Sequence, residues 1–204
     1  MSSKTVFSGK ADGVIPVPPG DDVQTACLLA VGLVSGHVGL TGIPDDILVP
    51  RDDAAALMKR KRLGIDIRNG AVFAKKSVIA NFDVDTVAYP DAVPALIAMF
   101  CVGSGSCVIS GAAGADYEQG YQMRKLADAL AAIGAHIKVS GDDIVITGQR
   151  RLFGGTAYAS GYAPVAMALS IAALRCETLV TIADVPGACD DYFHRLSALG
   201  ILVQ

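Results

Sequence analysis

The sequence predicts an α/β fold in which three βαβαββ repeats surround buried parallel helices. Three observations predict this architecture. Three segments of the chain align without gaps over most of their length, the first helix of each is apolar nearly all round, and the second helix of each ends at a glycine before a strand. We therefore expect a single lobe over residues 1–204, with repeat units at about 9–76, 77–150 and 151–204.

The first half of each repeat is an apolar helix followed by a short strand. The three segments read "GDDVQTACLLAVGLVSGHVGLTGI", "YPDAVPALIAMFCVGSGSCVISGA" and "SGYAPVAMALSIAALRCETLVTIAD". Each begins with a turn-like cluster, continues with a long apolar run and breaks before a β-rich stretch. Strands are therefore expected at Val38–Thr41, Cys107–Ser110 and Leu179–Ile182. Helices that are apolar all round pack inside a core, which places these three helices in the interior.

The second half of each repeat is a more polar helix that ends at a glycine. The segments read "AAALMKRKRLGIDI", "RKLADALAAIGAHI" and "YFHRLSALGILV". A left-handed residue that ends each helix is expected at Gly64, Gly134 and Gly200. In the second copy, "HIKVSGDDIVITG" predicts a hairpin that turns at residues 140–142. The third copy lacks its last strand, and we expect either Thr5–Ser8 or Val14–Val17 to supply it.

Composition excludes several classes of function. The chain has 204 residues and a net charge of −3, so no basic field draws it to nucleic acid or to an anionic membrane. The longest apolar runs fall short of the ~20 residues that span a bilayer. The N-terminus has no apolar core typical of a signal peptide. We expect a cytoplasmic protein that binds neither nucleic acid nor membrane.

The cysteines and histidines do not indicate a metal site. The 5 cysteines contain no CxxC pair, and most lie within or beside apolar patterns, which predicts buried free thiols in a reducing compartment. The 3 histidines show no ligand-like spacing. We expect no metal and no cofactor.

At this point the chain resembles one lobe of the enolpyruvyl transferases, most closely the family of 5-enolpyruvylshikimate-3-phosphate (EPSP) synthase. The resemblance extends from about Val14 to Gly200 and implies one lobe of an inside-out α/β barrel. It is carried by the stretches "PPGDDVQTACLLAVGLVSGHVGLTGI", "YPDAVPALIAMFCVGSGSCVISG", "LADALAAIGAHIKVSGDDIVITG", "APVAMALSIAAL" and "DDYFHRLSALG". In the family the active site lies in a cleft between two such lobes, and this chain supplies one of them. The implied chemistry is enolpyruvyl (carboxyvinyl) transfer in the shikimate pathway.

The resemblance implies a catalytic role for Asp91. It matches the aspartate of the family's "PDA" helix, which transfers protons beside the bound substrate. A helix start also favours an anion. The alternative is that Asp91 caps the helix that begins near Ala92.

The family's Lys-Glu-Ser/Thr-Asp-Arg motif, which binds phosphoenolpyruvate, is replaced in this chain. Its positions fall on Glu118, Gln119, Gly120, Tyr121 and Gln122. Arg124 and Lys125 lie nearby, and a slip of the alignment would bring one of these cations near the cleft. Otherwise they belong to a solvated face of the helix. The resemblance thus implies substrate-binding positions at Glu118, Gln119, Gln122 and Arg124.

The Asp-His-Arg motif of the family falls on Tyr162, Ala163 and Pro164. The arginine that would hold a carboxylate or phosphate with two hydrogen bonds is absent there, although proline suits the first turn of a helix. A family lysine falls near Gly187. A hydrogen bond to a charged group is worth about 1.5–3 kcal/mol, so the loss of several predicts no transferase activity for the chain alone. Tyr162 stays a candidate substrate-binding residue.

Three hypotheses for function follow. The first is an EPSP-synthase-like half-protein without independent enolpyruvyl transfer, with a role in binding or assembly. The second is one half of a split or homodimeric enolpyruvyl transferase, in which a second lobe chain brings the missing cations and the ligand is a small anionic metabolite. The third is a domain of a longer chain.

Overall fold

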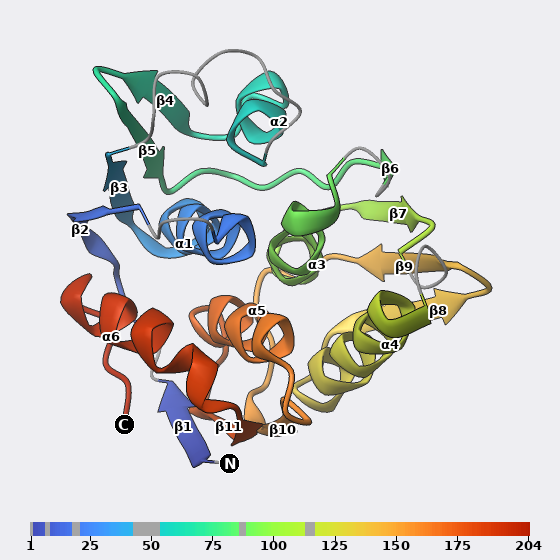
Figure 1. Cartoon of the computed structure of the whole chain (residues 1–204). Coiled ribbons are helices and arrows are strands. Elements are labelled where there is room, and N and C mark those ends of the chain that lie inside the picture. The colour runs from blue at the N-terminus through green and yellow to red at the C-terminus, as the bar shows by residue number, and fades with distance from the viewer. Residues whose placement is uncertain (1, 7–8, 18–20, 43–53, 86–88, 113–116) are drawn as a thin grey trace.

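Three helices lie side by side in the centre of the molecule, and three sheets with three further helices surround them (Figure 1). The computed structural model describes residues 2–6, 9–17, 21–42, 54–85, 89–112 and 117–204, with the side chains of residues 117–121 excepted. The central helices are α1 (Asp22–Ser35), α3 (Val93–Cys101) and α5 (Ala163–Ala173). The outer helices are α2 (Ala54–Arg60), α4 (Tyr117–Ala132) and α6 (Asp190–Ala198). Short 3₁₀ turns, η2 (Pro90–Ala92) and η3 (Gly187–Cys189), precede α3 and α6.

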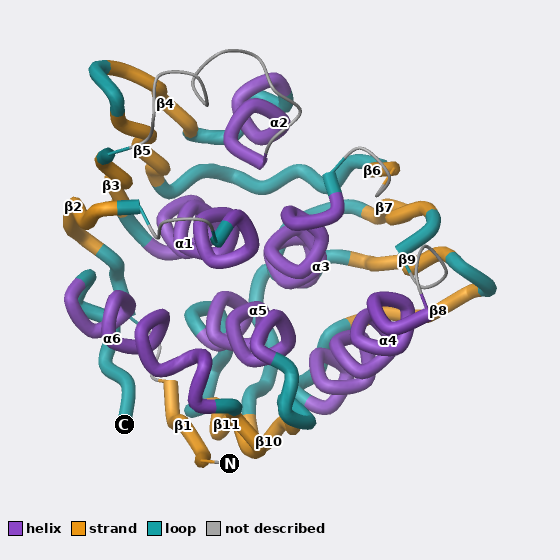
Figure 2. Tube along the Cα trace, viewed as in Figure 1, coloured by secondary structure: helices purple, strands orange, loops and turns teal. Residues whose placement is uncertain are grey.

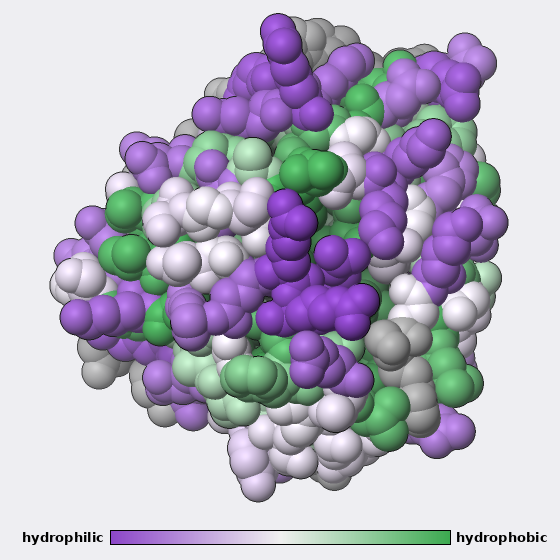
Figure 3. Space-filling view, turned by 180° about the vertical axis from the view of Figure 1, so that it is seen from behind, coloured by the Kyte–Doolittle hydropathy of each residue, from purple (hydrophilic) through white to green (hydrophobic). Residues whose placement is uncertain are grey.

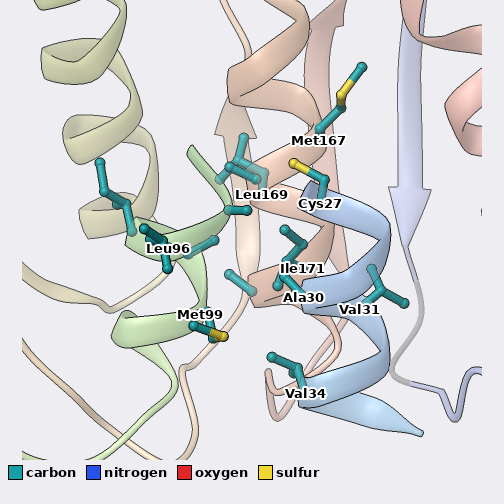
Figure 4. Packing of buried hydrophobic residues seen from close by; sticks show 14 of the residues in the cluster. Cys27, Ala30, Val31, Val34, Leu96, Met99, Met167, Leu169 and Ile171 are labelled. Atoms are coloured by element: carbon teal, nitrogen blue, oxygen red, sulfur yellow. The ribbon is translucent and has the colours of Figure 1, made fainter. Parts of the chain in front are cut away.

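The central helices form the core because their sequences are apolar on every side. All residues of α3 are buried, and α5 is buried from Val165 to Ala173. Each of the three helices packs against the other two. Figure 4 shows Ala30 and Val34 of α1, Leu96 of α3, and Leu169 and Ile171 of α5 within this cluster. Burial of such side chains is the main favourable term in folding. The prediction of interior helices is confirmed.

The three sheets share one order of strands. The first contains β2 (Asp12–Pro16), β3 (His37–Thr41), β5 (Ala71–Lys75) and β4 (Ile65–Arg68), in that order. The second contains β6 (Val84–Asp85), β7 (Ser106–Ser110), β9 (Asp143–Thr147) and β8 (His136–Ser140). The third contains β10 (Gly155–Tyr158), β11 (Val180–Val185) and β1 (Ser2–Val6). In each sheet the first pair of strands is parallel and the next pair antiparallel. Figure 2 shows the sheets at three sides of the helical centre.

The N-terminal strand completes the third sheet. Thr5 exchanges two backbone hydrogen bonds with Gln204, of 2.7 and 3.0 Å, and Val6 bridges to Val203. The two chain ends therefore share one sheet. Of the two predicted candidates for this place, Thr5–Ser8 overlaps β1 at Thr5 and Val6, and its residues 7–8 lie outside the described residues. The Val14–Val17 alternative is wrong, because those residues belong to β2 and its continuation beside β3 in the first sheet.

The glycine signature is confirmed in two of three places. Gly134 and Gly200 have φ of +100° and +85° after α4 and α6. The prediction for Gly64 is wrong, because the left-handed residue after α2 is Arg62, with φ of +58°. Gly64 instead serves a close approach, since an added Cβ would lie 2.4 Å from Lys75 O. The predicted hairpin is confirmed, and Gly141 in its turn has φ of +64°.

Candidate functional site

The starts of the three central helices lie at one end of the molecule. Asp91, in η2 before α3, interacts electrostatically with Asp21 and Asp22 at the start of α1. The start of α5 is tied to the same end through Cys189, whose thiol donates to Ala163 O at 3.8 Å. Burial and the carboxylates of Asp190 and Asp21 raise the pKa of Cys189 to about 11. We call this end of the molecule, which carries Asp21, Asp22, Asp91 and Ala163, the helix-start face.

The environment of Asp91 raises the pKa of its carboxyl. Partial burial raises the pKa of its carboxyl, and the Asp22 and Asp21 carboxylates raise it further. The alternative that Asp91 caps α3 is wrong: the N-cap of α3 is Ala92, and no side chain caps it. The carboxyl is therefore not used in the local helix start.

Asp21 and Asp22 complete a group of carboxylates that the sequence prediction missed. Asp21 caps α1, since its Oδ1 accepts from Gln24 N at 2.7 Å and its Oδ2 accepts from Gln24 Nε2 at 3.2 Å. The signal was present in "DDVQ", an acidic cap followed three residues later by a glutamine that reaches back to it. Asp22 occupies the first turn of α1, where the helix dipole favours a negative charge.

Tyr162 and Lys125 meet beside the start of α5. Tyr162 is the N-cap residue of α5 and makes no side-chain cap. Lys125 of α4 holds its Nζ 5.8 Å from the centre of the Tyr162 ring, a distance at which a cation is attracted to a ring face. The predicted candidate Arg124 has a different contact, because its Nη2 donates to Gly141 O at 3.0 Å in the hairpin turn. Of the two cations, Lys125 is therefore the one beside Tyr162.

The remaining predicted residues lie in α4 and in η3. Glu118 and Gln119 lie in the first turn of α4, and their side chains fall outside the described part of the chain. Gln122 is half-buried one turn further along. Gly187 begins η3, ahead of α6. The structure thus groups Asp91 with Asp21 and Asp22, and it places Lys125 beside Tyr162.

The carboxylates of this arrangement disfavour the binding of an anion. Carboxylates that share a site disfavour one another's charged forms, so one of them holds a proton at higher pH than usual.

Among the described residues, no group of His, Cys, Asp and Glu could hold a metal ion. The five cysteines are free and buried, as predicted. In the described part, no helix has the length and apolar character that crossing a membrane requires.

Solved structures of enolpyruvyl transferases share this fold. The EPSP synthase of Acinetobacter baumannii superimposes with a TM-score of 0.74 at 19% identity, over 91% of this chain and 47% of that chain. The enolpyruvyl transferase NikO of Streptomyces tendae superimposes with a TM-score of 0.72 at 18% identity, over 90% of this chain and 44% of that one. The inside-out α/β fold expected from the sequence is confirmed.

Sequence comparison gives the family. The model of EPSP synthase (3-phosphoshikimate 1-carboxyvinyltransferase) matches residues 8–192. The 3-phosphoshikimate 1-carboxyvinyltransferase of Clostridium acetobutylicum is 31% identical over 163 residues, 80% of this chain and 38% of that protein. The one from Halobacterium salinarum is 26% identical over 191 residues, 89% of this chain and 44% of that protein. The chain therefore belongs to the EPSP synthase family, and it spans less than half the length of these relatives.

Proposed function

We propose that this chain is an EPSP-synthase-type lobe without independent enolpyruvyl transfer, and that it binds a second lobe through the helix-start face. The observation that supports this most is the grouping of three carboxylates, Asp21, Asp22 and Asp91, at that face. Two family-motif positions add support, since Asp91 precedes α3 and Tyr162 precedes α5.

The three carboxylates oppose binding of an anionic substrate by the chain alone. Like charges repel, and the repulsion grows as the distance between them falls. Phosphoenolpyruvate carries both a phosphate and a carboxylate. Among the described residues, Lys125 offers a positive charge beside Tyr162, whereas Asp21, Asp22 and Asp91 are acidic. The balance is unfavourable for phosphoenolpyruvate until a partner adds cations.

The same charges select the kind of partner. A surface with lysines and arginines complements the helix-start face and is drawn to it by electrostatic steering. A face-to-face homodimer would bring two sets of these carboxylates together, which is repulsive. The partner is therefore a basic second lobe, carried either by a separate chain or by another part of a longer one.

A second candidate function is one half of a two-lobe enolpyruvyl transferase. Asp91 favours it, because burial and the neighbouring Asp22 and Asp21 carboxylates raise the pKa of this carboxyl, which makes it a stronger base than an ordinary aspartate. Lys125 supports it too, since it places a cation beside the start of α5. In this reading the second lobe supplies the remaining cations that bind the substrates.

Two measurements test the proposal. The purified chain is titrated calorimetrically with shikimate-3-phosphate and phosphoenolpyruvate and assayed for phosphate release, alone and with a separately expressed complementary lobe of a family member. We expect no binding at millimolar ligand and no turnover by the chain alone. Turnover only in the mixture, lost in Asp91→Asn but kept in the exposed control Asp142→Asn, supports the second candidate. Turnover by the chain alone overturns the proposal.

A further inference from the structure

A cavity lies at the opposite end of the central helices, away from the helix-start face. Its volume is about 370 Å³, and it is lined where α1, α3 and α5 end, by residues that include Val34, Lys76, Ser77, Val102, Arg150 and Arg175. At 1.5 Å per residue, α3 and α1 separate the two ends by about 14 to 21 Å. Figure 3 views the molecule from behind, and strongly hydrophilic side chains gather near the centre of that face beside apolar surface. We call this cavity the helix-end cavity.

Three cations from different segments converge on the helix-end cavity. Lys76 lies in the loop from β5 to β6, Arg150 in the loop from β9 to β10, and Arg175 just after α5. Within the described residues, the side chains of these three cations form no ion pair and donate no hydrogen bond. Lys76 and Arg150 are exposed and Arg175 is half-buried, so the three charges at this cavity are open to a ligand from solution.

Neutralising the ends of the helices does not account for these cations. Cations near a helix C-terminus offset the partial negative charge of its last carbonyls. Here, however, main-chain N–H groups satisfy those carbonyls: Lys76 N donates to Gly36 O at 2.6 Å, just beyond α1, Ser77 N to Leu33 O at 3.1 Å, and Gln149 N to Cys101 O at 2.8 Å. After α5, Arg175 N donates to Ala172 O at 3.0 Å. The charged side-chain ends are therefore left available.

The wall of the cavity also has a hydroxyl without a partner and an apolar surface. Ser77 Oγ is buried and makes no hydrogen bond within the described residues. A buried polar atom without a partner costs about 1–3 kcal/mol, which a ligand oxygen would recover. Val34, Val78 and Val102 line the same cavity, and Val78 is 83% exposed. The site thus offers three cations, one hydroxyl and apolar surface.

We propose that the helix-end cavity binds a small organic anion that carries phosphate or carboxylate groups. Its volume lies within the range of about 300–1,000 Å³ typical of small-molecule sites. Two of the cations are arginines, whose planar donors match the oxygens of phosphate and carboxylate. The cations come from the two loops that join the three sheets and from the end of α5, so a bound anion would link these segments. This site is independent of the proposed function of the helix-start face.

Amide-proton NMR of the labelled full chain tests the site. Inorganic phosphate and phosphoglycolate are titrated at constant ionic strength, with sodium chloride as the balancing salt. We expect saturable shifts at residues 76–79, 102–104, 150 and 175, with phosphoglycolate binding more tightly because its carboxylate adds a second anionic group for the three cations. Arg150→Gln and Arg175→Gln should each weaken binding about tenfold or more. Arg150→Lys should weaken it less, because it keeps the charge.

Arg151→Gln is the matched control, since Arg151 is the adjacent exposed arginine and does not line the cavity. It should leave the affinity within about twofold of the parent chain. The proposal would be overturned if Arg151→Gln and Arg150→Gln weakened binding equally, or if the shifts grew without saturation across the surface. Either result would mean that the anion interacts only non-specifically with the surface charge of the protein. Thermal unfolding without ligand verifies that each variant is folded. If Arg150→Gln is unfolded, the comparison of Arg150→Lys with Arg151→Lys decides.

Discussion

Asp91 is the residue whose setting differs most from what its place in the sequence suggests. It stands in a 3₁₀ turn before a helix, yet it caps nothing, and the Asp22 and Asp21 carboxylates lie close enough to act on it. Its charged form is thus disfavoured in the folded chain. A group arranged at a cost to stability is often one that function requires.

Asp91→Asn should stabilise the chain at neutral pH. Because the folded-state pKa of Asp91 is raised, the native state binds its proton more tightly than the unfolded chain does, so stability falls as the pH rises through the folded pKa. Removing the charge removes this loss. Urea unfolding at pH 7 should show a gain of up to about 1 kcal/mol, limited because the side chain is exposed. The gain should vanish near pH 3, and a loss of stability at pH 7 would contradict the assignment.

Ser170 and Tyr192 form a polar pair inside the core. Both are fully buried, Ser170 Oγ lies 2.9 Å from Tyr192 Oη, and Ser170 Oγ donates to Met167 O at 2.6 Å. Burial raises the pKa of Tyr192 well above its ordinary value, so the phenol stays neutral. The pair joins α5 to α6.

Ser170→Ala should destabilise the chain by about 1–3 kcal/mol, because Tyr192 Oη would keep only a 3.5 Å contact with Met167 O. The double variant Ser170→Ala/Tyr192→Phe should lose less than the sum of the single variants. Urea unfolding measures all three. Ser197→Ala, on the exposed side of α6, is the control and should change stability by less than about 0.5 kcal/mol. Strict additivity in the double variant would mean that the pair is not coupled.

At the scale of elements, the third sheet depends on β1. The strand comes from the opposite end of the sequence and covers the edge of β11, which would otherwise expose unpaired backbone groups. Val6 on this strand is fully buried, whereas Val14 on β2 is 54% exposed. Comparing alanine variants of Val6 and Val14 therefore distinguishes the effect of lost burial from the effect of losing a β-branched residue in a strand.

Val6→Ala should reduce the free energy of unfolding by about 2 kcal/mol, from lost burial and the cavity left behind. Val14→Ala should cost less than about 0.5 kcal/mol. Denaturant unfolding of both variants provides the comparison. Similar small losses in the two would show that β1 adds little to the third sheet.

At the scale of the whole molecule, the two ends of the helical centre carry opposite charge. The helix-start face is acidic and the helix-end cavity is basic. The separation of about 14 to 21 Å between them exceeds the Debye length of about 8 Å at physiological salt. The two sites can therefore bind unlike ligands without direct electrostatic competition.

Arg150→Gln should accordingly leave the pKa of Asp91 unchanged at 0.15 M salt. Asp22→Asn should lower that pKa, because it removes a neighbouring negative charge. Carboxyl-carbon NMR titration of the folded chain measures both. A clear shift of the Asp91 pKa in Arg150→Gln would show that the two ends are coupled through the structure.

The sequence by itself determined the fold of this protein. Apolar helices of one pattern recur three times, and burial of such helices is a local consequence of their composition. The left-handed ends at Gly134 and Gly200 were equally readable, since the requirement lies within one helix end. Gly64 was misread because a close approach to Lys75 O depends on a neighbouring strand.

Only the tertiary structure decided which charges meet. Asp21 and Asp91 are far apart in the sequence, and so are Lys76 and Arg175; packing of parallel helices brings each pair to one end of the molecule. The choice of β1 over the Val14 stretch for the third sheet was likewise a matter of register and pairing. Local patterns specify elements, whereas electrostatic interactions depend on distances in space, and the fold sets those distances.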